Sequence, residues 1–218
     1  MSEVLFPLFP LEIVLLPEEP LPLHIFEERY KRMIGECLKA KSAGSPEQEF
    51  GVILAKDKEM QPVGCGARIV NLTRKYSDGR MDILTVGTRR FDVLATDEER
   101  AYLRGDVEFF DDDNGADTAG EDDAQSAIAL FRDAMQRLHK SRDMPIHLPK
   151  PYRYLSFRIA APLPFDPDFK QQLLSIRNEA ERLHEVTLGM ESLIAQLDLL
   201  DKARSKAGGN GNIRSHQQ

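Results

Sequence analysis

The apolar positions near the start of the chain change their spacing at Phe26. Residues 5–25 are mostly apolar and carry five prolines, which lack a backbone N–H and fix φ, so a long helix cannot form there. The pattern predicts short extended pieces and turns, with residues 13–16 as the best strand. From Phe26 the apolar side chains recur at helical spacing and predict a helix that docks on the core through Phe26 and Tyr30. The predicted apolar face consists of Phe26, Tyr30, Met33, Ile34, Cys37 and Leu38.

Residues 50–110 carry several apolar runs of strand length. These runs cover residues 50–55, 63–76, 81–86, 90–95 and 102–110. The last run alternates between apolar and charged side chains, which is typical of a strand with one buried face. Several short antiparallel strands with glycine corners indicate a small barrel or sandwich.

Glycines mark the corners of this β region. Asp78 and Gly79 are predicted to be the central residues of a type I′ hairpin turn, because both positions of that turn need a positive φ. Gly64 and Gly66 allow a bulge or a close approach of the backbone. Gly87 is predicted to break the return strand.

An acidic run separates the β region from a helical region. Residues 111–123 carry seven acids and no base, which equals the whole net charge of −7. Repulsion among like charges predicts an extended, hydrated linker. The predicted organisation is a β lobe at 1–112, an acidic linker at 113–123, a helical lobe at 124–207 and a flexible tail at 208–218.

The helical lobe shows clear start signals. Apolar spacing predicts a helix at 124–139 and a short buried helix or turn at 155–163, separated by a proline-rich irregular segment. Asp166 followed by Pro167 is a strong helix start. The periodic stretch from there to residue 205 is compatible with one helix or two, and a capping box at Asn178 favours a break.

Composition narrows the class of protein. No apolar run is long enough to span a bilayer, and no signal peptide is evident. Two cysteines are too few for a disulfide scaffold, so we expect a reduced, cytoplasmic protein. No spacing of His or Cys supports a metal site. Without an excess of basic residues over the whole chain, nucleic acid is not expected as a partner.

Three stretches of the chain together resemble one known family. They are PLFPL followed by LPLHIFEERYKRM, then VGCGARI with DGR and VGTRRF, and finally YLSFRIAAPLPFDPDFKQQLL followed by AERL. In this order and spacing, over about residues 5–200, they are similar to the amino-terminal substrate-binding (LON) domain of Lon proteases. The chain departs from the family pattern at Glu18 and Glu19, where the family often has a glycine turn, and at Phe169.

The resemblance implies an α+β fold. The expected architecture is an N-terminal PUA-like, β-barrel-type lobe with one helix, followed by a C-terminal all-helical lobe. Phe91 would fill the barrel, and Arg90 would pair with an acid. The ATPase and protease modules of Lon are not expected, because the chain contains neither a phosphate-binding loop nor a serine nucleophile elbow.

The implied function is protein recognition by a stand-alone module without catalytic, metal or cofactor residues. The expected partners are unfolded or specific client proteins, together with a protease or chaperone system. We predict that the partner-binding groove lies where irregular backbone can accept an extended peptide. Its predicted contact residues are Phe6, Leu8, Leu11, Tyr152 and Tyr154.

Two other interpretations remain open. A PUA-like barrel could bind RNA or a nucleotide, or the chain could be an uncharacterised enzyme, although this argument rests on fold analogy alone. The basic face required for RNA would centre on residues 150–154 and would also include Arg137, Lys140, Arg142 and Arg158. His24 and Glu27 could be taken for an acid/base pair, but packing and helix-dipole roles explain them better. The oligomeric state stays undetermined.

Overall fold

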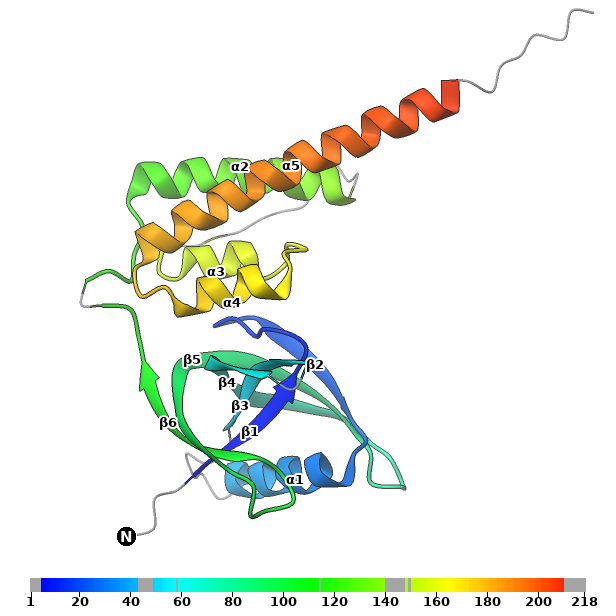
Figure 1. The fold of residues 1–218 in the computed structure, drawn as a ribbon, viewed down its shortest axis with the longest axis vertical. Coiled ribbons are helices and arrows are strands. Elements are labelled where there is room, and N and C mark those ends of the chain that lie inside the picture. Colours follow the sequence, from blue (N-terminus) through cyan, green and yellow to red (C-terminus); the bar gives the residue numbers. More distant parts are fainter. Residues whose placement is uncertain are drawn as a thin grey trace, which may run out of the picture.

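The computed structural model describes residues 5–42, 49–57, 59–113, 115–139, 148 and 150–209, and of residues 41–42 and 205–209 it describes the backbone alone. A β-barrel carries one helix at its lower end, and four further helices stack in two layers above its upper end (Figure 1). The mixed α+β class is therefore confirmed. The arrangement of these layers positions the candidate site.

Within the described residues, six strands form one sheet. They are β1 (Phe6–Leu11), β2 (Pro20–Ile25), β3 (Glu49–Lys56), β4 (Glu59–Lys75), β5 (Met81–Asp97) and β6 (Arg104–Phe110). Their order is β2-β5-β4-β3-β1-β6, and β6 also pairs with β5, which closes the barrel. The β1–β3 pair is parallel, and the other pairs are antiparallel. Register shifts in β4 and β5 bend these long strands. The bend allows β5 to pair with β2 and β4 near one edge of the sheet and with β6 at the other edge.

Phe91 fills the barrel, as the family resemblance implied. Its side chain is fully buried and packs with Leu8 and Ile53. Glycine is required around it, since a Cβ at Gly51 or at Gly64 would lie 2.4 Å from the Phe91 ring. The predicted close approach of the backbone at Gly64 is thus confirmed.

The prediction of a strand at residues 13–16 is wrong, because the strands lie on either side in the proline-containing segments. The backbone N–H of Leu8 donates to Leu103 on the β6 side of β1. Because alternate residues of a strand point to the same side, an N–H at position 10 would also face β6. β6 pairs only with Phe6 and Pro7, so no hydrogen bond is lost when Pro10 lacks its N–H. β2 lies at the edge of the sheet, where prolines are tolerated.

Two predictions about glycine corners need correction. β5 runs unbroken through Gly87, whose N–H donates to the Glu19 carbonyl and whose carbonyl accepts from the Glu18 N–H, both at 2.9 Å. A Cβ at Gly87 would lie 2.0 Å from the Leu16 carbonyl oxygen, so glycine is there for close contact. The hairpin between β4 and β5 is confirmed. Its turn is not type I′, because among residues 77–80 only Gly79 has a positive φ, of 85°.

Helix α1 (Glu28–Ser42) covers the lower end of the barrel (Figure 1). Tyr30 is buried, as predicted, and its ring lies 4.0 Å from the Phe9 ring. Phe26 is 60% exposed, so the prediction that it docks the helix is wrong. The helix begins two residues after Phe26, whose ring instead lies beside His24.

The helical part contains α2 (Glu121–His139), α3 (Leu155–Ala160), α4 (Pro167–Ser175) and α5 (Glu179–Gly209). Asp166 caps α4 by accepting from the Phe169 N–H at 2.9 Å, as its sequence predicts. The predicted break into two helices is confirmed, and Asn178 caps α5 through the Ala180 and Glu181 N–H groups. α3 and α4 lie next to the barrel, while α2 and α5 form the outer layer (Figure 1).

Two parts of the acidic run differ from the extended, hydrated segment that its charge predicts. Its last three acids form the first turn of α2, where the helix dipole favours them. The Asp112 side chain is fully buried between Arg90 of β5 and Arg182 of α5, at 2.5 Å and 2.7 Å. The expected acid partner of Arg90 is therefore Asp112.

A buried network extends from Asp112 into two helices. The Arg182 guanidinium also contacts Glu179 at 2.5 Å, and the Glu179 carboxylate accepts from the Ser156 N–H and hydroxyl. These contacts connect the barrel to α3 and α5. The division of the chain at 113–123 stays a prediction. Of the predicted tail, residues 208–209 belong to α5, and 210–218 lie outside the described residues.

Candidate binding site

The turn between β1 and β2 is the first wall of a pocket. Residues 16–19 form a tight turn in which the Glu19 N–H donates to the Leu16 carbonyl at 3.1 Å. Pro17 takes the second position, which suits its fixed φ, and Glu18 takes the third with a φ of 65°. This is a type II turn, whose third position favours glycine. The turn is anchored to β5 by the two backbone hydrogen bonds with Gly87.

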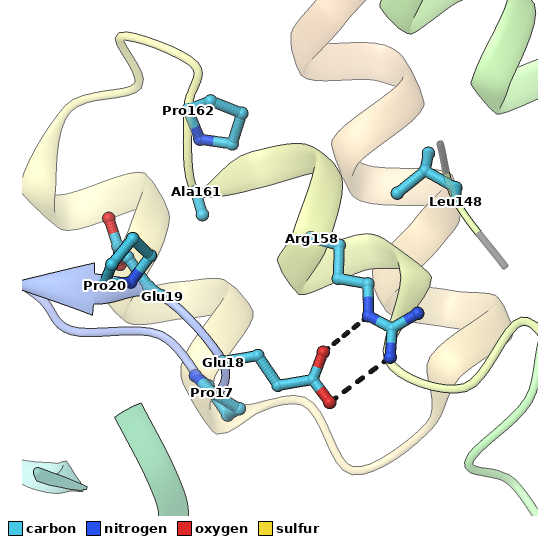
Figure 2. Close-up of a pocket in the computed structure, with 8 residues that line it drawn as sticks. All are labelled: Pro17, Glu18, Glu19, Pro20, Leu148, Arg158, Ala161 and Pro162. Carbon is cyan, nitrogen blue, oxygen red and sulfur yellow. Dashed lines mark hydrogen bonds and ion pairs between the residues drawn. The ribbon is translucent and has the colours of Figure 1, made fainter. Parts of the chain in front are cut away.

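The pocket lies between this turn and the C-terminal end of α3 and has a volume of about 430 Å³. Figure 2 shows the turn on one side and α3 on the other, with the side chains converging on the space between them. Most of the lining is apolar, and three of its residues are prolines. The lining residues are Pro17, Glu18, Glu19, Pro20, Leu148, Arg158, Ala161 and Pro162.

One ion pair crosses the pocket. The Arg158 Nε and Nη2 atoms donate to the two carboxylate oxygens of Glu18 at 2.5 Å and 3.3 Å (Figure 2). Every other residue of α3 is buried, so the packing of the helix directs Arg158 outward. The Arg158 side chain is 26% exposed and the Glu18 side chain 48% exposed. The arginine is therefore the more firmly held partner.

The second carboxylate of the lining is part of the framework. Glu19 accepts from its own turn at the Leu16 N–H, at 2.9 Å, and pairs with Lys170 of α4 at 3.3 Å. Lys170 also donates to the Ala161 carbonyl at 3.0 Å. Both side chains of this pair are less than one-fifth exposed. They hold the turn against the helices and neutralise each other.

The predicted contact residues do not line this pocket. Leu8 is fully buried and, with the half-buried Phe6, belongs to the small cluster around Phe91. Leu11, Tyr152 and Tyr154 pack in the larger core, where Tyr152 is 7% exposed and its hydroxyl is bonded to Gln125. A partner surface at these positions stays a prediction, and the side chains of Leu8 and Tyr152 are inaccessible in this structure.

The predicted basic face is largely neutralised by acids. Lys150 pairs with Glu121 at 2.6 Å, and Arg153 pairs with Asp117 at 2.8 Å. Arg137 pairs with Asp133 and Asp198. Lys140 and Arg142 lie outside the described residues. Since these described cations already have carboxylate partners, the face offers little positive charge to a phosphate backbone.

The chemistry available in the described residues is limited. Both cysteines are free and buried, and burial raises the pKa of Cys37 and of Cys65 to about 12, so their thiols stay protonated at neutral pH. His24 pairs with Asp82 at 2.5 Å rather than with Glu27. No group of His, Cys, Asp and Glu side chains in the described part of the chain could hold a metal ion. Among the described helices, none is both long and apolar enough to cross a membrane.

The pocket could not be found from sequence spacing, because its walls are far apart in the chain. Glu18 and Arg158 are separated by 140 positions. One local signal was present. Glutamate follows Pro17 at a position where the resembled family often has a glycine turn. The structure gives this departure its meaning, because Glu18 has a positive φ, which is uncommon for a residue other than glycine.

Comparison with known proteins identifies the family. The chain is 24% identical over 208 residues to Lon protease 1 of Hydrogenovibrio crunogenus, which covers 87% of this chain but only 23% of that protein's length. A crystal structure of a Lon N-terminal domain protein from Xanthomonas campestris matches 84% of this chain and 96% of its own with a TM-score of 0.63 and 25% identity.

A second solved structure supports the fold. The N-terminal domain of a Mycobacterium avium complex Lon protease matches 86% of this chain and 98% of its own, with a TM-score of 0.58 and 15% identity. The family model for the ATP-dependent protease La (LON) substrate-binding domain matches residues 6–192. The chain therefore belongs to the LON substrate-binding domain family.

Proposed function

We propose that this protein is a non-catalytic recognition module that binds flexible segments of client proteins in the pocket between the β1–β2 turn and α3. The observation that carries the proposal is the apolar, proline-lined space of about 430 Å³ in a chain of the LON substrate-binding family. Ligand pockets are typically apolar with a few polar groups that fix orientation, and here Arg158 and Glu18 provide them. Client proteins and a protease or chaperone system remain the proposed partners.

The chemistry of the described residues supports a role in binding. The pocket lining contains no histidine, cysteine or serine, so it lacks the usual nucleophile and base of acyl transfer. Its charged side chains are all engaged in ion pairs. We propose the cytoplasm as the compartment, because the two cysteines are free thiols.

The experiment that tests the function fills the pocket. Ala161→Trp places a large side chain against the prolines of the pocket and should block client binding. The client is a fluorescently labelled protein that stays unfolded because its disulfides are permanently reduced, and its binding is measured by fluorescence anisotropy. We expect at least about a tenfold loss of affinity, since the apolar surface that the client would cover is removed.

The matched control is Ala195→Trp, which adds the same side chain at an exposed position of α5. It should leave binding unchanged. Melting temperatures of both variants show whether the fold is intact. If a stably folded Ala161→Trp variant binds the unfolded protein as well as the unchanged chain does, the pocket is not the client site.

A further inference from the structure

Glu18 occupies a backbone position that disfavours it. The third residue of a type II turn needs a positive φ, which glycine adopts freely and a side chain with a Cβ adopts at a cost. A glutamate at this position indicates that its side chain is needed. The only hydrogen bonds and ion pairs found for the Glu18 side chain among the described residues are those with Arg158, across the pocket.

The two partners of this ion pair are held differently. Arg158 projects from a helix whose other five residues are all buried, whereas Glu18 lies on a turn and keeps about half of its side chain in solvent. Ion pairs this exposed contribute little to stability, because water solvates each charge almost as well. A second carboxylate can therefore take the place of Glu18 on Arg158, while the Glu18 side chain moves into water.

We infer that the pocket binds the C-terminal end of a client protein, with the terminal carboxylate on Arg158 in the place of Glu18 and the last apolar side chains in the pocket. This inference rests on the proposed function and names its ligand class. The planar fork of an arginine suits two-point binding of a carboxylate, and Arg158 already uses its Nε and Nη2 atoms in this way.

A chain end fits the pocket better than an internal acidic residue. Pro17, Pro20 and Pro162 have no backbone N–H, so a peptide that passes through would find few donors for its own carbonyl groups. A chain end enters from one side only, and its carboxylate lies next to its last side chain. One charged group and one or two apolar side chains can then share a single space of about 430 Å³.

Glu18 acts in this scheme as a built-in competitor. Its carboxylate is tethered beside Arg158 and must be displaced before a client carboxylate can bind, which weakens the apparent affinity. The turn is further tied to Gly87 and, through Glu19, to Lys170. The wall therefore stays in place when the Glu18 side chain leaves.

The test uses the full chain and three fluorescein-labelled glycine–serine peptides. The first ends in two leucines with a free carboxylate, the second is its C-terminal amide, and the third is an amide that ends in glutamate. We expect the free acid to bind at least about tenfold more tightly than either amide. The leucine amide has no carboxylate for Arg158, and the glutamate amide has no apolar last side chain next to its carboxylate.

Two variants assign the effect to the ion pair. Glu18→Gly removes the competitor and fits the turn, so it should tighten binding of the free acid about fivefold to tenfold and leave the amides unchanged. Arg158→Gln should abolish the difference between acid and amide. Glu12→Gly removes an exposed carboxylate outside the pocket lining and should change nothing.

The outcomes separate this inference from the proposed function. Equal binding of acid and amide, or equal binding of the glutamate amide and the acid, would overturn the preference for a chain end. A folded Glu18→Gly variant without tighter binding would overturn the competitor role. In these cases the pocket can still bind the unfolded protein, and Ala161→Trp reports on that binding. If neither the peptides nor the unfolded protein bind, both the inference and the proposed function fail.

Discussion

The carboxylate of Asp112 lies between two buried guanidiniums that come from distant parts of the chain. Burial by itself raises the pKa of Asp112, but the hydrogen bonds and positive charges of Arg182 and Arg90 outweigh it and hold the pKa below its usual range. The ionised carboxylate is therefore the form that stabilises the fold.

Replacing Asp112 with asparagine should destabilise the protein strongly. Arg90 would remain buried without its carboxylate partner, and Arg182 would keep Glu179 alone. Breaking a buried ion pair in this way typically costs about 3–5 kcal/mol. Chemical denaturation at neutral pH measures the loss. Asp111→Asn is the matched control, because that side chain is half-exposed and its pair with Arg89 is worth about 0–1 kcal/mol. Equal stability of the Asp112→Asn variant and the unchanged chain would show that the network contributes nothing.

The same substitution should change the response to acid. Because the folded pKa of Asp112 is lowered, its contribution to stability is present above the unfolded pKa of about 3.9 and is lost as the pH falls through the folded value. The difference in unfolding free energy between the unchanged chain and Asp112→Asn should thus be constant near neutral pH and shrink below about pH 4. A difference that grows on acidification would contradict this sign.

Phe26 and Tyr30 form a natural pair for testing burial. Tyr30→Ala should cost about 3–5 kcal/mol, because the ring is 6% exposed and packs on Phe9. Phe26→Ala should cost less than about 0.5 kcal/mol, because most of its ring is already in water. Thermal or urea unfolding of the two variants measures both losses of stability. A large loss of stability for Phe26→Ala would place the Phe26 ring in an interface.

At the scale of single elements, the barrel depends on glycines that accommodate Phe91. Gly64→Ala should destabilise by about 1–3 kcal/mol, because the new methyl group would overlap the Phe91 ring and approach the Val52 carbonyl. The penalty should be smaller in a Phe91→Leu background, which a double-mutant cycle measures.

Gly35→Ala provides the opposite case. Gly35 lies within α1, and apart from the adjacent residues and the backbone of the helix itself, no atom lies within 4 Å of an added Cβ. Alanine should therefore stabilise the helix by about 0.5–1 kcal/mol. A stabilising effect at Gly64, or a loss at Gly35, would contradict the local packing described here. The stabilities of the Gly64→Ala and Gly35→Ala variants are measured from unfolding curves under one set of conditions.

The elements that could be predicted from sequence are those with local signals. Asp166 and Asn178 cap helices through their own neighbouring N–H groups, so their sequence context was sufficient. The segments of β1 and β2 were predicted only as short extended pieces, and the best strand was placed between them. A proline is tolerated in a strand only where the neighbouring strand needs no donor from it, and this depends on the strand pairing. The family motifs predicted the barrel and the roles of Phe91 and Arg90. They could not reveal the pocket, since the Glu18–Arg158 contact joins remote segments.

At the scale of the whole molecule, the larger of the two hydrophobic clusters is shared by the barrel and the helices. Buried side chains from β3 and β4 belong to the same cluster as those from α2 and α4. The Asp112 network adds polar contacts across the same boundary. A predicted domain division at 113–123 therefore does not imply independent stability of the two parts.

We predict a single cooperative unfolding transition. Since one continuous core spans both parts, neither can lose its structure without exposing apolar surface of the other. Differential scanning calorimetry should give one peak with equal calorimetric and van't Hoff enthalpies. Two resolved transitions would instead show that the parts unfold separately.

The position of β1 in the sheet has a consequence for synthesis on the ribosome. Phe6 pairs with Gly105 of β6, so the first strand made must wait for the last strand before the barrel can close. At about 5–20 residues per second this delay is roughly 5–20 seconds. During it the apolar segment FPLFPL is unprotected. Its two prolines cannot donate to a neighbouring chain, and they therefore limit aggregation of the nascent protein.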